Sequence, residues 1–204
     1  MKTQGWTDNF FLVGVGGQGI LLAADVIALV GMEAGYDVKK SEVHGMAQRG
    51  GSVTSHVRWG ERVYSPLISP GEVDYLLAFE RLEGLRHAEM LRPGGVMLVN
   101  DYRIIPVSVS AGGSHYPSAE EEEGIYREAG LDPYYIPAIE IAQTLGNARV
   151  NNIVMLGALA ALLEVPPELW RQVIAQRVPE RYREINLEGF AQGYGYLAKL
   201  RGRK

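Results

Sequence analysis

The sequence contains no cysteine. A chain without thiols can form neither disulfides nor thiolate zinc sites, and it offers neither a cysteine nucleophile nor cysteine ligands for an iron–sulfur cluster. Positive charge is not in excess either, because 20 Lys and Arg residues stand against 24 Asp and Glu residues, which gives a net charge of -4. Nucleic-acid binding normally depends on a positive patch that displaces counterions, so we expect no nucleic-acid partner.

Long apolar segments are also missing. Two uncharged stretches, 10–24 and 151–163, are both shorter than the roughly 18–20 apolar residues that span a bilayer. Residues 1–5 lack the apolar run and the small-residue cleavage site of a secretory signal. We therefore expect a cytoplasmic protein that does not bind membranes.

Glycine is the residue present in excess, with 25 of 204 residues against a usual share of about 7%. Between the glycines, short apolar runs predict strands and amphipathic stretches predict helices, one of them preceded by a capping box at Ser118 and Glu121. The predicted strands are 10–13, 37–43, 73–79, 96–99 and 134–137. The predicted helices are 20–35, 81–91, 119–130, 139–145, 153–163 (with Asn151 as its cap), 167–176 and a last one from 186 onward.

A β-hairpin is predicted where an alternating run at 52–58 is followed by a turn at 59–62 and a second run at 63–68. Because strands and helices alternate along the rest of the chain, we expect an α/β fold with an open, mostly parallel, Rossmann-like sheet. The β-hairpin would be an excursion from this sheet. We expect residues 1–204 to form a single domain, with a helical C-terminal extension from about residue 151.

Residues 14–19 read GVGGQG, which fits G-x-G-x-x-G between a predicted strand and a predicted helix. In such a loop the first glycine allows a tight turn, the second lets the backbone approach a phosphate, and the third lets the helix pack on the strand. The helix N-terminus then offers unpaired N–H groups to an anion. Alternatively, the glycines serve only the close packing of helix and sheet. We favour phosphate binding, with Gly14, Gly16, Gly17, Gln18 and Gly19 as the candidate residues.

A second loop follows the predicted strand 37–43, at the sheet edge where open α/β sheets bind ligands. Arg49 and the two glycines after it can place a guanidinium and backbone N–H groups around an anion. Arg49 could equally pair with a structural carboxylate, and His44 is more typical of a hydrogen-bonded loop residue than of a catalytic base. His56 is expected to be a packing or surface residue. The candidate residues of this second loop are Ser41, His44, Gly45, Arg49, Gly50, Gly51 and Ser52.

A dinucleotide site would also need an acidic residue at the carboxyl end of the second strand. Asp37 has the right spacing but lies at the start of that strand, and Glu42 lies at the right end but late in the sequence. This disfavours a free-standing NAD- or flavin-dependent oxidoreductase, which stays as an alternative. The sequence also lacks a nucleophile elbow, an H-E-x-x-H motif and a spaced His/Asp cluster for a metal, so we expect no catalytic residue and no metal site.

The two segments together, GVGGQG at 14–19 and SEVHGMAQRGGSV at 41–53, resemble the β subunits of indolepyruvate:ferredoxin oxidoreductases. Those subunits correspond to the γ subunits or domains of the wider 2-oxoacid:ferredoxin oxidoreductase family. Arg49-Gly50 looks like the core shared by the wider family, whereas residues 44–48 look like the arylpyruvate branch. Further matches are at 57–58, 64–68, 77–80, 93–95 and 152–158.

The resemblance implies oxidative decarboxylation of an arylpyruvate to an arylacetyl-CoA, with reduction of ferredoxin. Thiamine diphosphate, its magnesium ion and the iron–sulfur clusters would sit on a larger α subunit, because this chain has no cysteine and no Gly-Asp-Gly motif followed by an Asn. Ferredoxin would be reached through that subunit. This chain would not catalyse alone, and it would contribute coenzyme A or phosphate binding and subunit assembly.

Two other functions remain open at this point. The chain could be the γ subunit of a pyruvate or 2-oxoglutarate:ferredoxin oxidoreductase, or a purely structural subunit that binds no small molecule. Gly189, Gly193 and Gly195 weaken the last helix by roughly 1 kcal/mol each relative to alanine, which indicates a helix that depends on a partner surface. An isolated chain that exposes an apolar docking patch could cover it by forming a homodimer.

Overall fold

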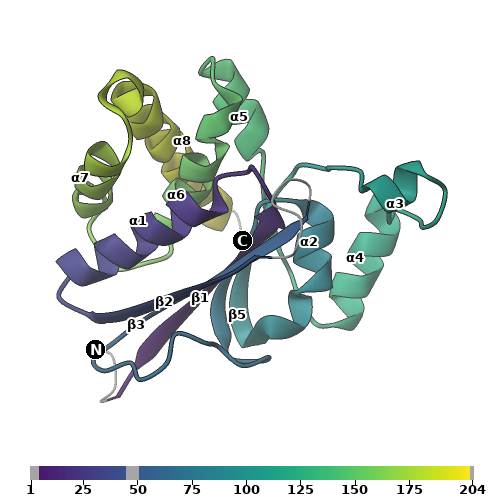
Figure 1. Ribbon diagram of the computed structural model, residues 1–204, viewed down its shortest axis with the longest axis horizontal. Coiled ribbons are helices and arrows are strands. Elements are labelled where there is room, and N and C mark those ends of the chain that lie inside the picture. The colour runs from purple at the N-terminus through teal and green to yellow at the C-terminus, as the bar shows by residue number, and fades with distance from the viewer. Residues whose placement is uncertain (1–4, 45–50, 203–204) are drawn as a thin grey trace.

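The computed structural model describes residues 5–44 and 51–202. A six-stranded sheet with the order β2-β3-β1-β4-β5-β6 runs through the molecule (Figure 1). The strands are β1 (Thr7–Val15), β2 (Asp37–His44), β3 (Ser52–Gly60), β4 (Val73–Ala78), β5 (Leu91–Asn100) and β6 (Tyr134–Ile136). The helices are α1 (Ile20–Glu33), α2 (Arg81–Arg86), α3 (Val107–Ser110), α4 (Ala119–Glu128), α5 (Ala138–Thr144), α6 (Asn151–Ala160), α7 (Pro167–Arg177) and α8 (Arg183–Arg201), with short 3-10 turns η1 (Ala88–Met90), η2 (Ala148–Val150) and η3 (Glu180–Tyr182).

The sheet is mostly parallel, as expected for an open α/β fold. Strand β1 is parallel to β4, β4 to β5, and β5 to β6. Strand β3 is antiparallel to both of its neighbours, β1 and β2. Of the six described strands, β3 is therefore the one that runs against the rest, and β2 points in the same direction as β1.

The predicted hairpin was wrong in its second arm. Residues 63–68 form no strand, and β3 pairs instead with the preceding strand β2. Pro66 within this segment and Pro70 just after it have no backbone N–H to donate to a neighbouring strand. Side chains of β3 instead form hydrogen bonds with the backbone of residues 65–68. The Arg58 guanidinium donates to the carbonyl oxygens of Ser65 and Leu67, each at 3.2 Å. The excursion is thus a β2–β3 hairpin with an irregular segment packed beside it.

His56 lies on β3 under this irregular segment and is a packing residue, as expected. The side chain is 8% exposed, its ring packs edge-on against Phe11, and its Nδ1 accepts a hydrogen bond from the Ile68 amide at 3.3 Å. Burial lowers the pKa of His56, because the charged ring would lose water. The hydrogen bond from the Ile68 amide requires an unprotonated Nδ1. Burial and this hydrogen bond therefore both favour the neutral ring.

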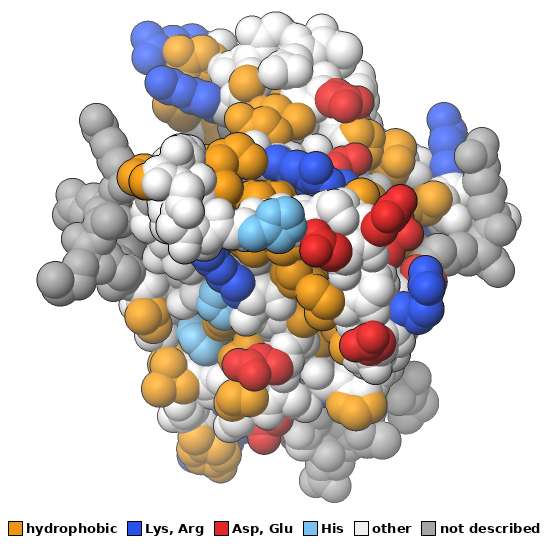
Figure 2. Space-filling view, turned by 90° about the vertical axis from the view of Figure 1, so that its right-hand side faces the viewer, with side chains coloured by type: hydrophobic (Ala, Val, Ile, Leu, Met, Phe, Trp, Pro, Cys, Tyr) orange, Lys and Arg blue, Asp and Glu red, His pale blue; other side chains and the backbone are white. Residues whose placement is uncertain are grey.

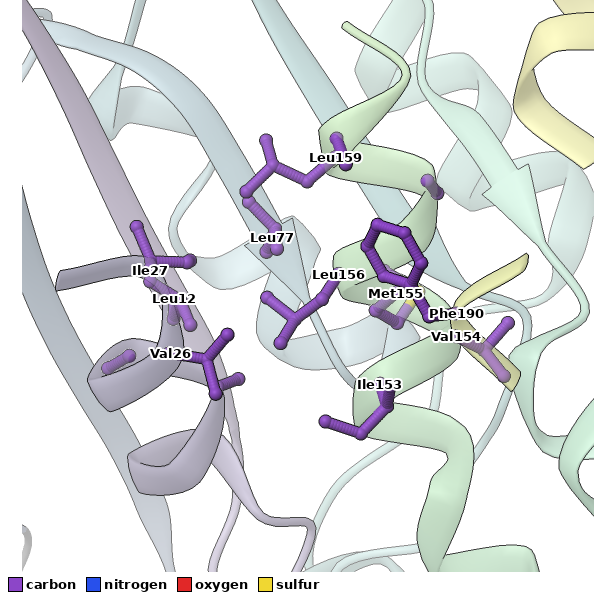
Figure 3. Packing of buried hydrophobic residues seen from close by; sticks show 14 of the residues in the cluster. Leu12, Val26, Ile27, Leu77, Ile153, Val154, Met155, Leu156, Leu159 and Phe190 are labelled. Atoms are coloured by element: carbon purple, nitrogen blue, oxygen red, sulfur yellow. The ribbon is translucent and has the colours of Figure 1, made fainter. Parts of the chain in front are cut away.

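Helices cover both faces of the sheet. Figure 1 shows α1, α6, α7 and α8 over one face and α2 and α4 against the other. All ten residues of α6 are buried, so this helix lies inside the protein rather than on its surface. Figure 3 shows Leu156 extending from α6 toward Leu12 of β1 and Val26 of α1, which places α6 at the centre of the larger core.

The crossing of α6 and α8 is made by glycines. A Cβ at Gly193 would lie 2.0 Å from the carbonyl oxygen of Val154, and one at Gly157 would lie 2.1 Å from that of Phe190. The two backbones therefore touch, which only glycine allows. The expectation that glycines leave the last helix in need of an external surface is corrected here, because the surface that supports α8 is α6 of the same chain.

One face of the molecule carries charges of both signs. On the face that carries α3 and α4, acidic, basic and hydrophobic side chains alternate without a single-sign patch (Figure 2). Within residues 5–44 and 51–202, none of the helices combines the length and the apolar character needed to cross a bilayer.

Candidate functional site

The two predicted loops start from the same edge of the sheet. Val15, at the end of β1, pairs with Ser52, at the beginning of β3. One residue further on, the Gly16 amide donates to the carbonyl oxygen of Gly51 at 2.9 Å. The loop at 14–19 and the end of the second loop are therefore joined directly. Gly45, Arg49 and Gly50 lie outside the described residues, and for His44 the structure describes the backbone, which pairs with Val53 in the β2–β3 hairpin.

The glycines of the first loop serve different purposes. A Cβ at Gly14 would lie 2.7 to 2.9 Å from Gln18, Ile20 and Phe79, and one at Gly19 would lie 2.4 Å from the amide nitrogen of Asn152. These two glycines permit close packing, which is the alternative that the sequence left open. Gly17 differs, because its φ is +104° and none of the described residues has an atom within 4 Å of the position of a Cβ. At Gly17 the backbone itself is open to solvent and to a ligand.

Gln18 fixes the loop from inside. Its Oε1 accepts a hydrogen bond from the Val15 amide at 2.7 Å, and its Nε2 donates to the carbonyl oxygen of Phe79, also at 2.7 Å. The side chain thus closes the turn and ties it to the carboxyl end of β4. Its amide group is used within the protein, so Gln18 shapes the candidate site.

The second loop offers few free side chains among its described residues. Each one either bonds to another part of the protein or lies away from the first loop. The Ser52 hydroxyl donates to the carboxylate of Glu83, which also accepts from Arg86 at 2.7 Å. Ser41 lies within β2 opposite His56, three residues before the strand ends. Asp37 opens β2 at the far end of the hairpin, where it accepts from the Val63 amide at 2.8 Å. This position agrees with the argument against a dinucleotide site.

A cavity of about 510 Å³ lies beside the glycine loop. Its walls come from the loop, from α1, from the segment after β5, from α5, and from the turn η2 and the first residues of α6. The lining residues are Gly16, Gly17, Gln18, Gly19, Leu22, Tyr102, Ile104, Ile139, Ala148, Arg149, Asn151 and Asn152. Sequence reasoning named Gly16, Gly17, Gln18 and Gly19 as site residues and missed the rest.

The N-termini of two helices, α1 and α6, meet at this cavity. α1 begins at Ile20 after Gly19, and α6 begins at Asn151 after Val150, so Asn151 is the first helical residue rather than the cap that the sequence predicted. Neither helix has an acidic residue in its first turn. In α6 the Asn151 amide already donates to the carbonyl oxygen of Ala148, and the Ile153 amide donates to the Asn152 side chain. The open N–H groups that favour an anion therefore belong to α1, and α6 adds the positive end of its dipole. Exposed Arg149 adds a full positive charge, and no described side chain pairs with its guanidinium.

Asn152 holds the two helix N-termini together. Its Nδ2 donates to the carbonyl oxygen of Gly19 at 3.2 Å, and its Oδ1 accepts from the Ile153 amide at 2.8 Å. The residue is 4% exposed, so its position is fixed by packing as well as by hydrogen bonds. The sequence signal for it was the pair Asn151-Asn152 ahead of a wholly apolar helix, which indicates polar groups at a helix start but not what they contact.

A buried acidic cluster fixes the segment after β5, which forms one wall of the cavity. Glu80 caps α2 by accepting from the Glu83 amide at 3.0 Å, and it also accepts from the Ile104 amide at 3.1 Å and from the Tyr116 hydroxyl. Burial raises the pKa of Tyr116, and the adjacent Glu80 carboxylate raises it further, so the phenol remains a donor. These bonds fix the segment that carries Tyr102 and Ile104 over the cavity.

Arg81 ties α4 to the same region. Its guanidinium pairs with Glu122 at 2.8 Å and with Asp101 at 2.7 Å. Glu122 lies in the first turn of α4, whose predicted capping box at Ser118 and Glu121 is present. In the described part of the chain, no group of three or more His, Asp or Glu side chains is arranged to hold a metal ion.

Comparison with known proteins agrees with the resemblance drawn from the two loops. A curated relative, indolepyruvate oxidoreductase subunit IorB of Thermococcus kodakarensis, is 39% identical over 197 residues, which are 95% of this chain and 98% of that protein. The γ subunit of a keto/oxoacid ferredoxin oxidoreductase from Geobacter sulfurreducens is 26% identical, with a TM-score of 0.69 over 93% of this chain and 98% of its own.

Another solved structure shares the fold at lower sequence identity. It is a 2-oxoglutarate:ferredoxin oxidoreductase from Magnetococcus marinus, solved with 2-oxoglutarate, coenzyme A and succinyl-CoA bound. Its identity to this chain is 24% and its TM-score is 0.72, over 95% of this chain and 31% of the other. The model of the pyruvate ferredoxin/flavodoxin oxidoreductase family matches residues 9–196. The chain belongs to this family, and within it the chain resembles the indolepyruvate oxidoreductase subunits.

Proposed function

We propose that the chain, as one γ-type domain, is the β subunit of a cytoplasmic, thiamine-dependent arylpyruvate:ferredoxin oxidoreductase. We favour indolepyruvate as the substrate because two relatives are named indolepyruvate oxidoreductase subunits. Each is 39% identical to this chain over nearly the full length of both sequences. The reaction would convert the 2-oxoacid and coenzyme A into arylacetyl-CoA, carbon dioxide and a proton, and its two electrons would reduce ferredoxin. A γ subunit acting on a smaller 2-oxoacid is the alternative, because substrate choice would reside mainly on the thiamine-bearing chain.

The proposal divides the work between two subunits. The larger α subunit would hold thiamine diphosphate, magnesium and the iron–sulfur clusters and would reduce ferredoxin. The absence of cysteine from this sequence supports that division, because protein-bound clusters are held mainly by cysteine thiolates. This chain would not catalyse alone, and its part would be to bind the phosphates of coenzyme A and to complete the assembly.

The observation that carries the coenzyme A proposal is the convergence of two helix N-termini and Arg149 on one cavity. Backbone N–H groups, helix dipoles and a guanidinium are the groups that bind phosphates in proteins. The cavity volume of about 510 Å³ is in the range of small-molecule sites. Gly17 leaves room for a phosphate to approach the backbone, and the end of the second loop is bonded to Gly16. That a relative with this fold was solved with coenzyme A bound makes the coenzyme the first ligand to test.

Isothermal titration of the assembled two-subunit complex with coenzyme A tests this function. Arg49→Ala should weaken binding about tenfold, because a hydrogen bond to a charged group contributes roughly 1.5–3 kcal/mol. Arg171→Ala removes an exposed arginine of α7 outside the cavity and is the matched control. A complex that binds no coenzyme A would support the purely structural alternative, and unchanged affinity in Arg49→Ala would remove Arg49 from the site.

A further inference from the structure

The sheet ends at β2 in an edge that no other strand of the described chain covers. Within residues 5–44 and 51–202, β2 pairs with β3 on one side and with no strand on the other. None of residues 37–43 is buried. A strand at the edge of a sheet presents backbone N–H and C=O groups that can pair with a strand of another chain. Proteins often shorten such edges or interrupt them with proline, but β2 has eight residues and no proline.

The charges on β2 determine how two copies of this strand can pair. Lys40 bonds to Asp25 of α1 and to Glu42 at 2.6 Å, so Lys40 and Glu42 share the face of the strand that carries α1. In an antiparallel pair related by a two-fold axis, opposite residues point to the same side of the sheet, so the axis passes through a residue position. Axes at 39, 40 or 42 would place Lys opposite Lys or Glu opposite Glu. An axis at Ser41 places Lys40 of each copy opposite Glu42 of the other.

Exposed apolar side chains lie along the same edge. On α1, which lies over β2 in Figure 1, Leu21 is 38% exposed and Met32 is 59% exposed. They stand four residues before and seven residues after Asp25, so the three side chains share one stripe of the helix. The ion pair between Asp25 and Lys40 shows that this stripe faces the β2 edge. On β2 itself, Val43 is 50% exposed. Covering these side chains with a second protein surface would favour association.

We propose that the β2 edge binds the β2 edge of a second copy of this chain, antiparallel, with the two-fold axis at Ser41. The two sheets then form one continuous sheet, and α1 of each copy lies on the same face of it. Backbone hydrogen bonds supply the affinity, and the two Lys40–Glu42 pairs between the copies select the register. The inference concerns assembly and does not depend on coenzyme A binding.

Sedimentation velocity of the full-length chain at a series of concentrations tests this proposal. The wild type should form a dimer with twice the 22.4 kDa mass of one chain. Glu42→Lys places Lys opposite Lys40, and Lys40→Glu places Glu opposite Glu42, so each variant should dimerise about tenfold more weakly. Mixing the two variants should restore the dimer, because every Lys then faces a Glu. Glu128→Lys makes the same charge change at an exposed position of α4 and is the matched control.

The other outcomes overturn the proposal. A wild-type chain that stays monomeric would show that the β2 edges do not pair. A dimer that is equally strong in Glu42→Lys and Glu128→Lys would use another surface. A mixture of two folded variants that stays monomeric would show that these charges do not set the register. If Lys40→Glu fails to fold because it loses its bond to Asp25, the comparison of Glu42→Lys with Glu128→Lys still decides. Each of these results leaves the coenzyme A titration of the proposed function unaffected.

Discussion

In the loop before α1, no atom of the described residues lies within 4 Å of the position where a Cβ of residue 17 would stand. In α8, by contrast, the Cβ of residue 193 would lie 2.0 Å from the carbonyl oxygen of Val154. The first glycine keeps space open beside a cavity, and the second removes the space between two helices. Both belong to the same compositional excess of glycine. The comparison teaches that the excess has two causes, ligand access and backbone contact, which composition cannot separate.

The two kinds of glycine act on the same helix. The middle of α6 rests against α8 through Gly157 and Gly193, and its first turn faces the glycine loop through Asn152. Glycine contact at the crossing therefore sets how close α6 lies, and this in turn sets where Arg149 and Asn151 stand in the cavity. Substitutions in α8, in α6 and in the glycine loop test these contacts one by one.

The largest effect is expected for Gly193→Ala. The added methyl group meets the Val154 carbonyl, which is backbone and cannot move unless the two helices separate. Overpacking typically costs 1–3 kcal/mol and occasionally more, so we expect a loss of about 3 kcal/mol in the free energy of unfolding, measured by denaturant titration. Gly189→Ala is the matched comparison in the same helix, because its methyl group meets the Val150 side chain. Since a side chain can shift, its loss should be nearer 1 kcal/mol, and equal losses would contradict the distinction.

Much of the fold could be predicted from the sequence because its signals are local. The apolar run at 10–13 and the glycines after it predict β1, the loop and α1, and the start of β2 at Asp37 agrees with the predicted strand. Glycine at position 35, with φ +85°, follows the end of α1, close to where the predicted helix 20–35 ends. Each of these signals depends on residues a few positions apart, where backbone preference decides the structure.

The parts that were missed depend on residues far apart in the sequence. Nothing near position 149 indicates that its arginine would face residues 16–19, because that meeting is set by how α6 packs on α1 and α8. Residues 63–68 have an apolar pattern typical of a strand, but β3 already had a partner in β2, so the pattern was outweighed by tertiary pairing. The glycines of α8 predicted a weak helix, and the compensating contact with Val154 lies about 40 positions away.

Asn152→Ala should have the next largest effect. The change leaves the Gly19 carbonyl oxygen and the Ile153 amide without their side-chain partner, and both groups lie at a buried junction. Losing these bonds should lower the free energy of unfolding by about 2 kcal/mol. Because the side chain joins the two helix N-termini, coenzyme A binding to the assembled complex should also weaken. A variant that loses stability but keeps its affinity would show that α6 needs no link to the loop.

Gly17→Ala separates conformation from access. At φ +104° an alanine is strained, and we expect a loss of roughly 1–2 kcal/mol in the free energy of unfolding. The methyl group would stand free beside the cavity, so the coenzyme A affinity of the complex should fall about tenfold, measured by isothermal titration. Normal affinity in a variant with the expected loss of stability would mean that Gly17 is needed for the turn alone.

The smallest effect, and the one of opposite sign, is expected for Gly195→Ala. This glycine lies in α8 two residues from Gly193, but no atom in the described part of the chain stands within 4 Å of its Cβ position. Alanine is favoured over glycine in a helix interior by about 1 kcal/mol, so the variant should gain up to that amount in denaturant titration. Coenzyme A affinity should be unchanged. A loss of stability here would show that α8 approaches a surface at residue 195 after all, and that surface would have to come from outside residues 5–44 and 51–202, among which the position is open.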